Sequence, residues 1–247
     1  YSILLLSAGM GTRLGSIGKK NPKCLLKIND KTLIETIINN LQKRNAKNIS
    51  IIVGYKSKML INFIAKLKLK NIKIKFIKIK GYEKYGHSYS WFKYKNQWLK
   101  EKKPLILLHT DIFFDVRYLD GILKNKKANI IGIKCQKNHI FKKDSLVVKV
   151  NKNNQIEKIN YLKKISKPFG EIIGINKFSA ETTGSIFSFM DKFFTEKKKY
   201  LSWESLMNNY IKKNKDKIFV LKNQNFFWIN INTIKDYLKA KKLKHEK

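Results

Sequence analysis

Apolar positions in the first half of the chain alternate between short unbroken runs and runs with helical spacing. Ile3 to Ala8 is uninterrupted, as expected of a parallel strand that is buried on both faces. Thr32 and Glu35 form a capping box, and apolar residues then recur at helical spacing as far as Asn45. We also expect strands over residues 49–53, 72–79 and 105–110, and helices over residues 57–67 and 91–100. This alternation predicts an α/β fold with a doubly wound, mostly parallel, Rossmann-like sheet.

The second half, which begins near Asn129, has a pattern typical of a mixed sheet. The expected strands cover residues 130–134, 146–150, 156–161, 172–175 and 218–221, and the expected helices cover residues 183–194 and 203–213. Thr233 and Asp236 cap a final helix. No repeat or low-complexity linker separates the halves. We therefore predict a single domain over residues 1–247, in which residues 129–247 form an α+β part appended to the parallel sheet of residues 1–128.

The formal net charge of +37 favours a polyanionic partner. Of the 54 cationic residues only Arg13, Arg44 and Arg117 are arginines, and the lysines are scattered along the whole chain. Nucleic-acid recognition favours arginine forks and clustered patches. We therefore expect a nucleoside triphosphate as the natural ligand and no specific nucleic-acid partner, only contacts that salt disrupts.

Apolar runs and cysteines narrow the class of protein further. No apolar run approaches the ~20 residues that span a bilayer, so no membrane association is expected. Tyr1 to Leu6 leads directly into a glycine-rich loop and is interpreted as a buried strand and not as a signal peptide, which favours a cytoplasmic location. Cys24 and Cys135 form no C-x-x-C motif, so neither a disulfide framework nor a zinc site is expected.

The most informative segment is the glycine-rich loop after the first strand. Its glycines, Gly9, Gly11 and Gly15, match neither the dinucleotide-binding G-x-G-x-x-G motif nor the Walker motif, and residues 15–23 are interpreted as a polar loop. Glycines at this position let the backbone approach phosphates. The residues expected to bind the nucleotide here are Ser7, Ala8, Gly9, Met10, Gly11 and Thr12. Arg13 and Lys23 can then cover a triphosphate with positive charge.

This segment resembles the nucleotidyltransferases of the sugar-phosphate and phosphocholine cytidylyltransferase type. Their signature is L-A-A-G-x-G-x-R followed by Pro-Lys-x-Leu, and the match covers the first 30 residues, ending in Pro22-Lys23-Cys24-Leu25. The resemblance implies that the glycine loop wraps the triphosphate and that Arg13 and Lys23 serve as catalytic cations. A substrate phosphate oxygen would attack the α-phosphorus and release pyrophosphate. Such a reaction requires alignment and positive charge, and no protein nucleophile.

The same resemblance directs attention to a magnesium site. Asp111 follows the apolar strand over residues 105–110, and Mg²⁺ prefers such an oxygen ligand, although Asp111 on its own reads as a turn cap. Family members add a second carboxylate in Glu-Ile-Asp-Thr before the last helix. The corresponding residues here are Asn230, Ile231, Asn232 and Thr233, so both acids are amides. We predict Asp111 and Asn232 as the metal ligands, with Asp111 also catalytic.

Base and acceptor recognition is expected in an aromatic-rich loop and in the second half. Residues 81–91 occupy the position of the family's recognition loop and resemble the Tyr-Asn-Asn-x-Tyr-Ser segment of phosphocholine-type enzymes. From it we expect Tyr85, Gly86, His87 and Ser88 to bind the nucleotide. The expected acceptor-binding residues are Tyr89, Glu171, Trp203 and Glu204, of which Trp203-Glu204 resembles a segment that binds a cationic head group in choline-type enzymes. Packing for stability is the plain alternative for the aromatic rings.

These observations favour a magnesium-dependent cytidylyltransferase. It would join CTP to a small phosphorylated or phosphonated amine, amide or alcohol for cell-surface decoration, with residues 1–128 binding the nucleotide and residues 129–247 the acceptor. A sugar-1-phosphate nucleotidyltransferase is one alternative. A nucleotide-binding pseudoenzyme is another, because Asn230 and Asn232 replace acids. A nucleic-acid-binding protein is suggested by charge alone, and the oligomeric state stays open.

Overall fold

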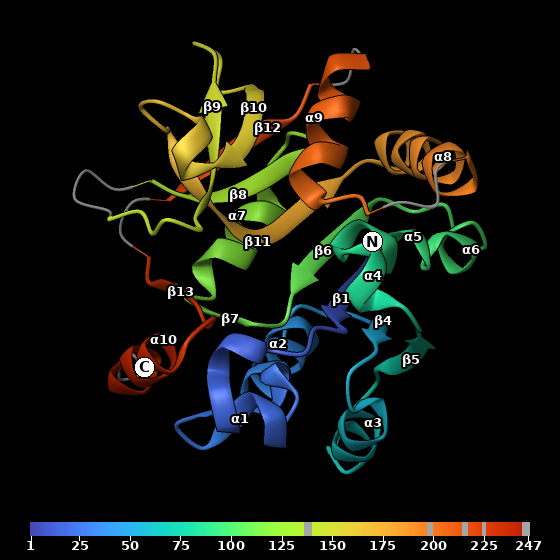
Figure 1. Ribbon diagram of the computed structural model, residues 1–247. Coiled ribbons are helices and arrows are strands. Elements are labelled where there is room, and N and C mark those ends of the chain that lie inside the picture. Colours follow the sequence, from blue (N-terminus) through green and yellow to red (C-terminus); the bar gives the residue numbers. More distant parts are fainter. Residues whose placement is uncertain (136–139, 197–199, 214–216, 224–225, 244–247) are drawn as a thin grey trace.

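One nine-stranded mixed sheet forms the centre of the computed structural model, which describes residues 1–135, 140–196, 200–213, 217–223 and 226–243 (Figure 1). The strand order is β10-β9-β11-β6-β1-β4-β5, with β8 paired to both β11 and β12. The strands are β1 (Ser2–Ser7), β4 (Asn48–Val53), β5 (Lys73–Lys78), β6 (Leu105–His109), β8 (Ile130–Lys134), β9 (Leu146–Val150), β10 (Ile156–Tyr161), β11 (Gly170–Phe178) and β12 (Phe219–Asn223). The predicted α/β class is confirmed.

The parallel and antiparallel parts of this sheet meet between β6 and β11. Strands β5, β4, β1 and β6 are parallel neighbours, with Leu5 opposite Ile51 on one side and Leu108 on the other. Strand β11 pairs antiparallel with β6, β8 and β9. It spans Gly170–Phe178, longer than the predicted 172–175, because it is the strand that joins the parallel half to the appended part.

Helices cover both faces of the sheet (Figure 1). The helices are α1 (Gly15–Lys20), α2 (Leu33–Gln42), α3 (Ser57–Ala65), α4 (Tyr82–Tyr85), α5 (His87–Phe92), α6 (Lys95–Trp98), α7 (Arg117–Lys124), α8 (Ala180–Glu196), α9 (Trp203–Lys213) and α10 (Ile234–Lys242). The capping boxes predicted at Thr32 and Thr233 are both formed. The single helix predicted over residues 91–100 is wrong: the chain forms two short helices there, α5 and α6.

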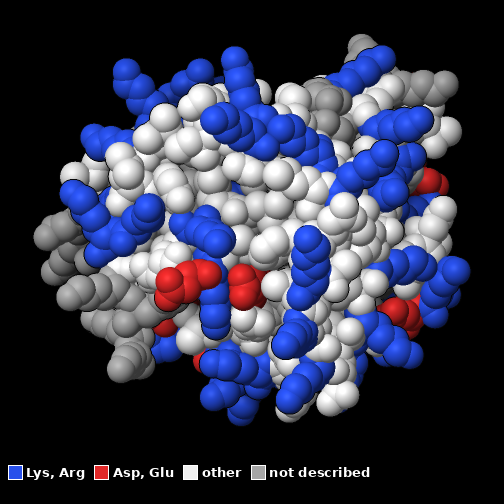
Figure 2. Space-filling view, turned by 90° about the horizontal axis from the view of Figure 1, so that it is seen from below, with Lys and Arg blue, Asp and Glu red and all other residues white. Residues whose placement is uncertain are grey.

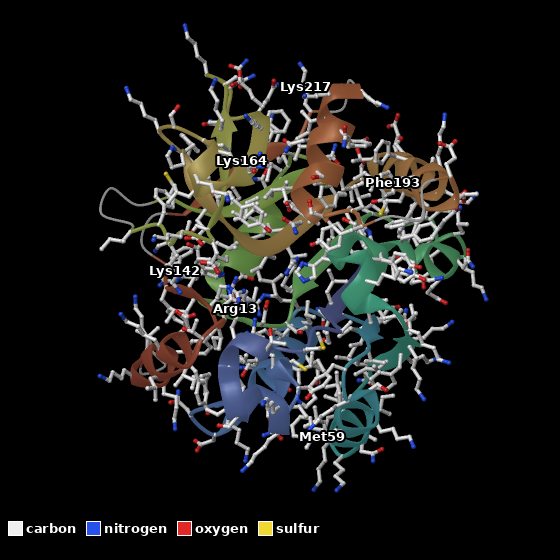
Figure 3. All side chains as sticks on the ribbon, in the orientation of Figure 1. Arg13, Met59, Lys142, Lys164, Phe193 and Lys217 are labelled. Atoms are coloured by element: carbon white, nitrogen blue, oxygen red, sulfur yellow. The ribbon has the colours of Figure 1, made fainter. Side chains whose placement is uncertain are left out.

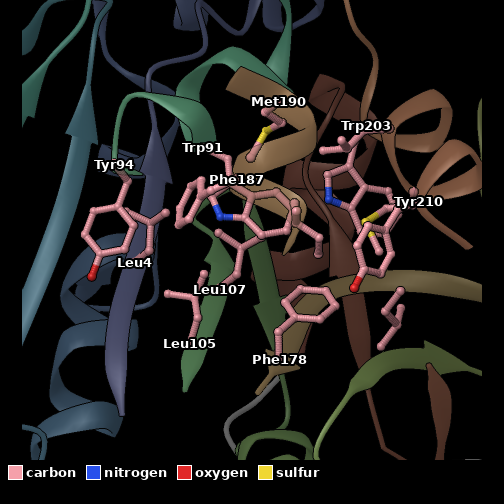
Figure 4. Close-up of a cluster of buried hydrophobic side chains, with 14 of the residues drawn as sticks. Leu4, Trp91, Tyr94, Leu105, Leu107, Phe178, Phe187, Met190, Trp203 and Tyr210 are labelled. Carbon is pink, nitrogen blue, oxygen red and sulfur yellow. The ribbon is translucent and has the colours of Figure 1, made fainter. Parts of the chain in front are cut away.

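The hydrophobic core is divided by the sheet. On one face, side chains of α5, α6, α8 and α9 pack on β1, β6 and β11, as Figure 4 shows for Trp91, Leu107 and Phe178. The rings of Trp91 and Phe178 are stacked with centroids 5.5 Å apart. On the other face α2, α3 and α7 cover the same strands. The sheet is therefore buried on both sides along its parallel part, as the unbroken apolar runs predict.

A third, smaller core joins the two ends of the chain. Short strands β7 (Ile112–Phe114) and β13 (Trp228–Asn230) pair antiparallel, and β2 (Lys27–Ile28) pairs with β3 (Lys31–Thr32). Leu14 and Leu26 from the N-terminal segment pack in one cluster with Ile231 and Ala240 from the C-terminal segment. This cluster packs the segment before α10, and the end of α10, against residues that follow the glycine loop.

The lysines show no concentration on the face that Figure 2 displays. Lysine and arginine side chains are scattered over this face between areas of other residues, with a few acids among them. Within the described part of the chain, no helix has the length and apolarity to cross a bilayer. The even spread of charge agrees with the pattern along the sequence.

The segment after the glycine loop departs from prediction. Residues 15–23 are not a plain polar loop, because Gly15–Lys20 forms the helix α1. Gly15 and Gly18 are poor helix formers, which hid this helix from the sequence pattern. The helix packs closely on the loop: a Cβ added at Gly18 would lie 2.3 Å from the carbonyl oxygen of Gly11.

We expect Gly18→Ala to destabilise the protein by ~1–3 kcal/mol, because the added methyl group forces α1 away from the glycine loop. The measurement is chemical denaturation. Gly9→Ala is the matched control, since a Cβ at Gly9 meets no atom within 4 Å and its stability should change by less than about 0.5 kcal/mol. Equal stability of the two variants would contradict this packing.

Candidate active site

The candidate site lies at the carboxyl ends of β1 and β6, where ligands bind in parallel α/β sheets. The glycine loop leaves β1 here and is held in place by its neighbours. The Tyr55 N–H donates to the Ala8 carbonyl at 3.1 Å, and the Ser7 hydroxyl donates to Thr110 Oγ1 at 2.9 Å. Gly11 has φ 64°, a left-handed conformation that favours glycine and turns the chain into the short helix Thr12–Leu14.

A first cavity of about 210 Å³ opens beside this loop. It brings together most of the residues predicted for the triphosphate, together with others. Its lining comprises Leu6, Ser7, Ala8, Gly9, Met10, Gly11, Thr12, Arg13, Lys23, Cys24, His87, Ser90, His109, Thr110, Asp111 and Asn232. The residues of the glycine loop and two cations thus surround one space, and a backbone of this kind together with positive charge suits the binding of phosphates.

The Lys23 ammonium lies between two oxygen atoms from distant parts of the chain. Its Nζ is 2.7 Å from Asp111 Oδ2 and 2.7 Å from Asn232 Oδ1. Burial acts to raise the pKa of Asp111, but the charge and hydrogen bond of Lys23 together with the charges of His109 and His87 outweigh it and lower the pKa to about 2. The carboxylate is therefore ionised at neutral pH, as a phosphate-site metal ligand needs to be.

Two other titratable groups in this lining are neutral at pH 7. Burial lowers the pKa of His109 to about 4, although the Asp111 carboxylate acts in the opposite direction. Burial raises the pKa of the Cys24 thiol to about 12. Neither group adds charge at pH 7. The Arg, Lys and Asp side chains that give the lining of the first cavity its charge are Arg13, Lys23 and Asp111.

Asp111 and Asn232 suit a magnesium ion. Their two oxygens already converge on a cation, the ammonium of Lys23. Among the described residues no group of three or more His, Cys, Asp or Glu side chains could hold a metal. Mg²⁺ in phosphate sites characteristically takes one or two protein ligands and completes its shell with phosphates and water, so one carboxylate and one amide fit this ion.

Arg13 is held by a carboxylate from the appended part of the fold. Its guanidinium pairs with Asp144, and the Arg13 side chain is 57% exposed. Figure 3 shows Arg13 where the N-terminal loop meets the segment that carries Lys142. Asp144 was not predicted from the sequence, because nothing in its neighbourhood marks it. In this state both predicted triphosphate cations are paired with carboxylates.

A second cavity of about 430 Å³ adjoins the first. The two share five lining residues: Arg13, His87, His109, Asp111 and Asn232. The remaining lining is formed by Ile112, Asp144, Leu146, Tyr161, Ile172, Ile173, Gly174, Asn176, Trp203, Glu204 and Asn230. Trp203 and Glu204, which were both predicted to bind the acceptor, thus line this cavity. Glu171 lines a neighbouring hollow of about 420 Å³ and not this cavity.

The aromatic-rich loop contributes less to these two cavities than predicted. His87 lines both, and Ser90 lines the first. The ring of Tyr89 packs against those of Tyr85 and Phe194, with centroid distances of 4.7 and 5.4 Å. Gly86 and Ser88 are buried. The structure therefore brings none of Tyr85, Gly86, Ser88 and Tyr89 into either cavity lining.

The fold is that of solved nucleotidyltransferases. The inositol-1-phosphate CTP transferase of T. maritima superposes with a TM-score of 0.79 at 19% identity, over 99% of this chain and 96% of that one. The chain belongs to the family described as a domain of unknown function, DUF6564, whose model matches residues 19–244.

Two relatives from Campylobacter jejuni subsp. jejuni serotype O:2 are nucleotidyltransferases. The CTP:phosphoglutamine cytidylyltransferase is 26% identical over 76% of this chain and 77% of its own length. The D-glycero-alpha-D-manno-heptose 1-phosphate guanylyltransferase is 29% identical over 85% of this chain and 86% of its own length. The resemblance predicted from the first 30 residues is confirmed.

Replacing Lys23 with Met removes the largest of the charges that lower the pKa of Asp111. Because the burial remains, we expect this pKa to rise from about 2 toward 3.8, its ordinary value, while His109 and His87 still act to lower it. In the unmodified protein the pair stabilises the fold above about pH 4, and this contribution is lost as the pH falls toward 2. Carboxyl ¹³C NMR titration of Asp111 measures the change.

The control is Lys142→Met, which breaks a different ion pair, that with Asp236. It should leave the pKa of Asp111 at about 2. A value that stays near 2 in Lys23→Met would show that Lys23 does not govern this carboxylate.

Proposed function

We propose that the protein is a magnesium-dependent cytidylyltransferase, which joins CTP to a small phosphorylated or phosphonated amine, amide or alcohol and releases pyrophosphate. The observation that carries this proposal is the position of Lys23, Asp111 and Asn232. They meet where a cavity beside the glycine loop opens into a second cavity. Two adjoining cavities with charged groups where they meet suit two substrates, one of which transfers its nucleotidyl group to the other.

The first cavity would hold the nucleotide. Backbone N–H groups of residues 8–12 bind the triphosphate, and Arg13 and Lys23 neutralise it. An oxygen of the acceptor phosphate, entering from the second cavity, attacks the α-phosphorus. The new P–O bond forms as the bond to the β-phosphate breaks, and its electron pair leaves with pyrophosphate. The chain's part is alignment and charge neutralisation, so no protein nucleophile is needed.

Magnesium would be held by Asp111 and Asn232 together with the phosphates, where it would neutralise charge as the pyrophosphate leaves. Lys23 then has to release both oxygens and turn toward the phosphates. Asn232 belongs to the second half of the chain, yet it lines the first cavity. In this proposal residues 1–128 bind most of the nucleotide and residues 129–247 most of the acceptor, and the two metal ligands come from both parts of the chain.

The choice of CTP is supported by the relatives. Both the phosphoglutamine enzyme and the inositol-1-phosphate enzyme are described as using CTP. The heptose 1-phosphate guanylyltransferase is the observation that favours the second candidate, a sugar-1-phosphate nucleotidyltransferase. Pyrophosphate release from CTP, GTP, UTP and dTTP, each with the same panel of acceptor phosphates, separates these candidates. Preference for GTP with a sugar 1-phosphate would replace the first proposal by the second.

Arg13→Ala should lower kcat/KM for CTP. The loss of transition-state stabilisation that this fall reports should be ~2–4 kcal/mol, as expected when a cation that faces developing phosphate charge is removed. Asp144→Asn should instead lower the KM for CTP, because Arg13 no longer has to leave a carboxylate. Steady-state pyrophosphate release at saturating acceptor measures both effects.

Arg117→Ala is the matched control for Arg13→Ala. The Arg117 side chain is 55% exposed and pairs with Asp115, but it lines neither cavity. Its kinetics should match those of the unmodified protein. Unchanged turnover in Arg13→Ala would contradict the proposal that Arg13 neutralises the triphosphate.

The amide at position 232 should raise the magnesium requirement without abolishing activity, because the phosphates supply most of the negative charge. We expect Asn232→Asp to lower the magnesium concentration at half-maximal rate and Asp111→Asn to lose nearly all turnover. A magnesium titration of pyrophosphate release on the three proteins measures this. If the unmodified protein is inert at every concentration while Asn232→Asp is active, the natural protein is a pseudoenzyme.

A further inference from the structure

An ion pair joins the glycine loop to the wall of the second cavity. The Arg13 guanidinium lines both cavities, and its partner, the Asp144 carboxylate, lines the second cavity and not the first. The two side chains are 57% and 45% exposed, so a solute in the cavities can reach them. An exposed ion pair contributes little to stability. A ligand that carries more charge can therefore replace either partner.

Asp144 keeps its place without Arg13, because its own loop is closed by hydrogen bonds. The Lys142 N–H donates to Ser145 Oγ at 2.8 Å, and the Ser145 N–H donates to the Lys142 carbonyl at 2.9 Å. Ser145 is buried, and the Lys142 ammonium pairs with Asp236 in the first turn of α10. Arg13 can therefore turn away while the Asp144 carboxylate stays at the second cavity.

Acids outnumber lysine and arginine in the lining of the second cavity, the reverse of the chain as a whole. Among the described residues this lining contains Asp111, Asp144 and Glu204 against a single arginine and no lysine. The whole chain has 54 cationic residues and 17 acids. Asp111 is already neutralised by Lys23. The charge on the rest of the lining therefore depends on whether Arg13 is present.

Tyr161 shows that Arg13, Asp144 and Glu204 act on one part of this cavity. Burial raises the pKa of Tyr161, the charges of Glu204 and Asp144 act in the same direction, and the charge of Arg13 acts in the opposite one. With Arg13 in place, one positive charge faces two negative charges. When Arg13 turns toward a triphosphate, both carboxylates lose this cation, and this part of the lining attracts positive charge.

We propose that Asp144 is a specificity-determining residue of the second cavity, and that Arg13 neutralises it until a triphosphate binds. Nucleotide binding then frees the carboxylate, and the cavity takes an acceptor phosphate whose head group is a primary ammonium. The proposal rests on the proposed function, which places the triphosphate at Arg13. It adds a coupling between the two cavities, because the nucleotide sets the charge that the acceptor meets.

Two effects of the nucleotide favour a cationic head group. The triphosphate draws away a guanidinium that repels the ammonium, and it leaves the Asp144 carboxylate free to pair with that ammonium. A neutral head group of the same size gains from neither effect. Coupling between two binding sites is reciprocal, so a cationic acceptor strengthens nucleotide binding by the same factor. We expect this factor to be ~5-fold, at the lower end of ordinary couplings, because the ion pair is exposed.

Equilibrium binding measures this coupling without turnover. The acceptor probe is 2-aminoethyl phosphate, and 2-hydroxyethyl phosphate is its neutral counterpart with the same phosphate group. Each is titrated calorimetrically into the protein with magnesium, in the absence and presence of saturating α,β-methylene-CTP, whose α–β bridge is not cleaved. The analogue should lower the Kd of the amine ~5-fold relative to its effect on the alcohol. An equal effect on both probes, or no binding of the amine, would overturn the proposal.

Asp144→Asn tests the residue itself, because an amide of the same shape replaces the carboxylate. The preference for the amine that the analogue produces should disappear in this variant. The matched control is Asp191→Asn, since Asp191 is also an exposed aspartate in an ion pair, with Lys95, but lines neither cavity. Its coupling should stay at ~5-fold. Full coupling in Asp144→Asn would show that another group attracts the ammonium, contrary to the proposal.

The same titrations separate this proposal from the proposed function. If α,β-methylene-CTP binds without favouring the amine, the coupling is refuted, and pyrophosphate release still tests the cytidylyltransferase. If pyrophosphate is released only with neutral acceptors, the enzyme is established and the cationic head group is wrong. If no nucleotide binds, the proposed function fails and the coupling fails with it.

Discussion

The contact between the Lys23 ammonium and the oxygens of Asp111 and Asn232 is the interaction on which the candidate site depends. It joins the loop after β1, the end of β6 and the segment before α10, which are separated by 88 and 209 positions along the chain. An ion pair alone contributes little to stability. Here it is supported by the third core cluster, which packs Leu14 and Leu26 against Ile231. The hydrophobic cluster positions the segments that carry Lys23 and Asn232, and the charges of Lys23 and Asp111 give the candidate site its electrostatic character.

Although the chain has only 17 acids against 54 cationic residues, three aspartates form ion pairs around this site. Asp111 pairs with Lys23, Asp144 with Arg13 and Asp236 with Lys142. Each pair neutralises a cation that would otherwise repel its neighbours in a cleft of this strongly positive protein. Under the proposed function, a triphosphate would replace these carboxylates as the partner of Arg13 and Lys23, and Asp111 would then be available to a metal ion.

The sequence predicted the parallel half well because its signals are local. The apolar run of β1, the glycine loop and the capping box at Thr32 each lie within a few residues, and the structure forms all three. The helix α1 was missed because Gly15 and Gly18 disfavour helices, and only the contact with Gly11 explains why glycine is present there. Tyr85 and Tyr89 were expected at the substrates because their segment resembles the recognition loop of phosphocholine-type enzymes, and in the structure the two rings pack on each other and the Tyr89 ring also packs on Phe194.

The sequence by itself determined the fold class and marked the glycine-rich loop with Arg13 and Lys23 as the candidate phosphate site, because each depends on short-range patterns that any similar segment would share. The resemblance also directed attention to Asp111 and Asn232. Only the tertiary structure decided that these two oxygens meet at Lys23, that Asp144 holds Arg13 and that Asn176 lines the cavity beside Trp203. Asp144 and Asn176 carry no local signal. Asn176 is placed by the pairing of its strand, β11, with both β6 and β8, and Asp144 by the pairing of the following strand, β9, with the start of β11.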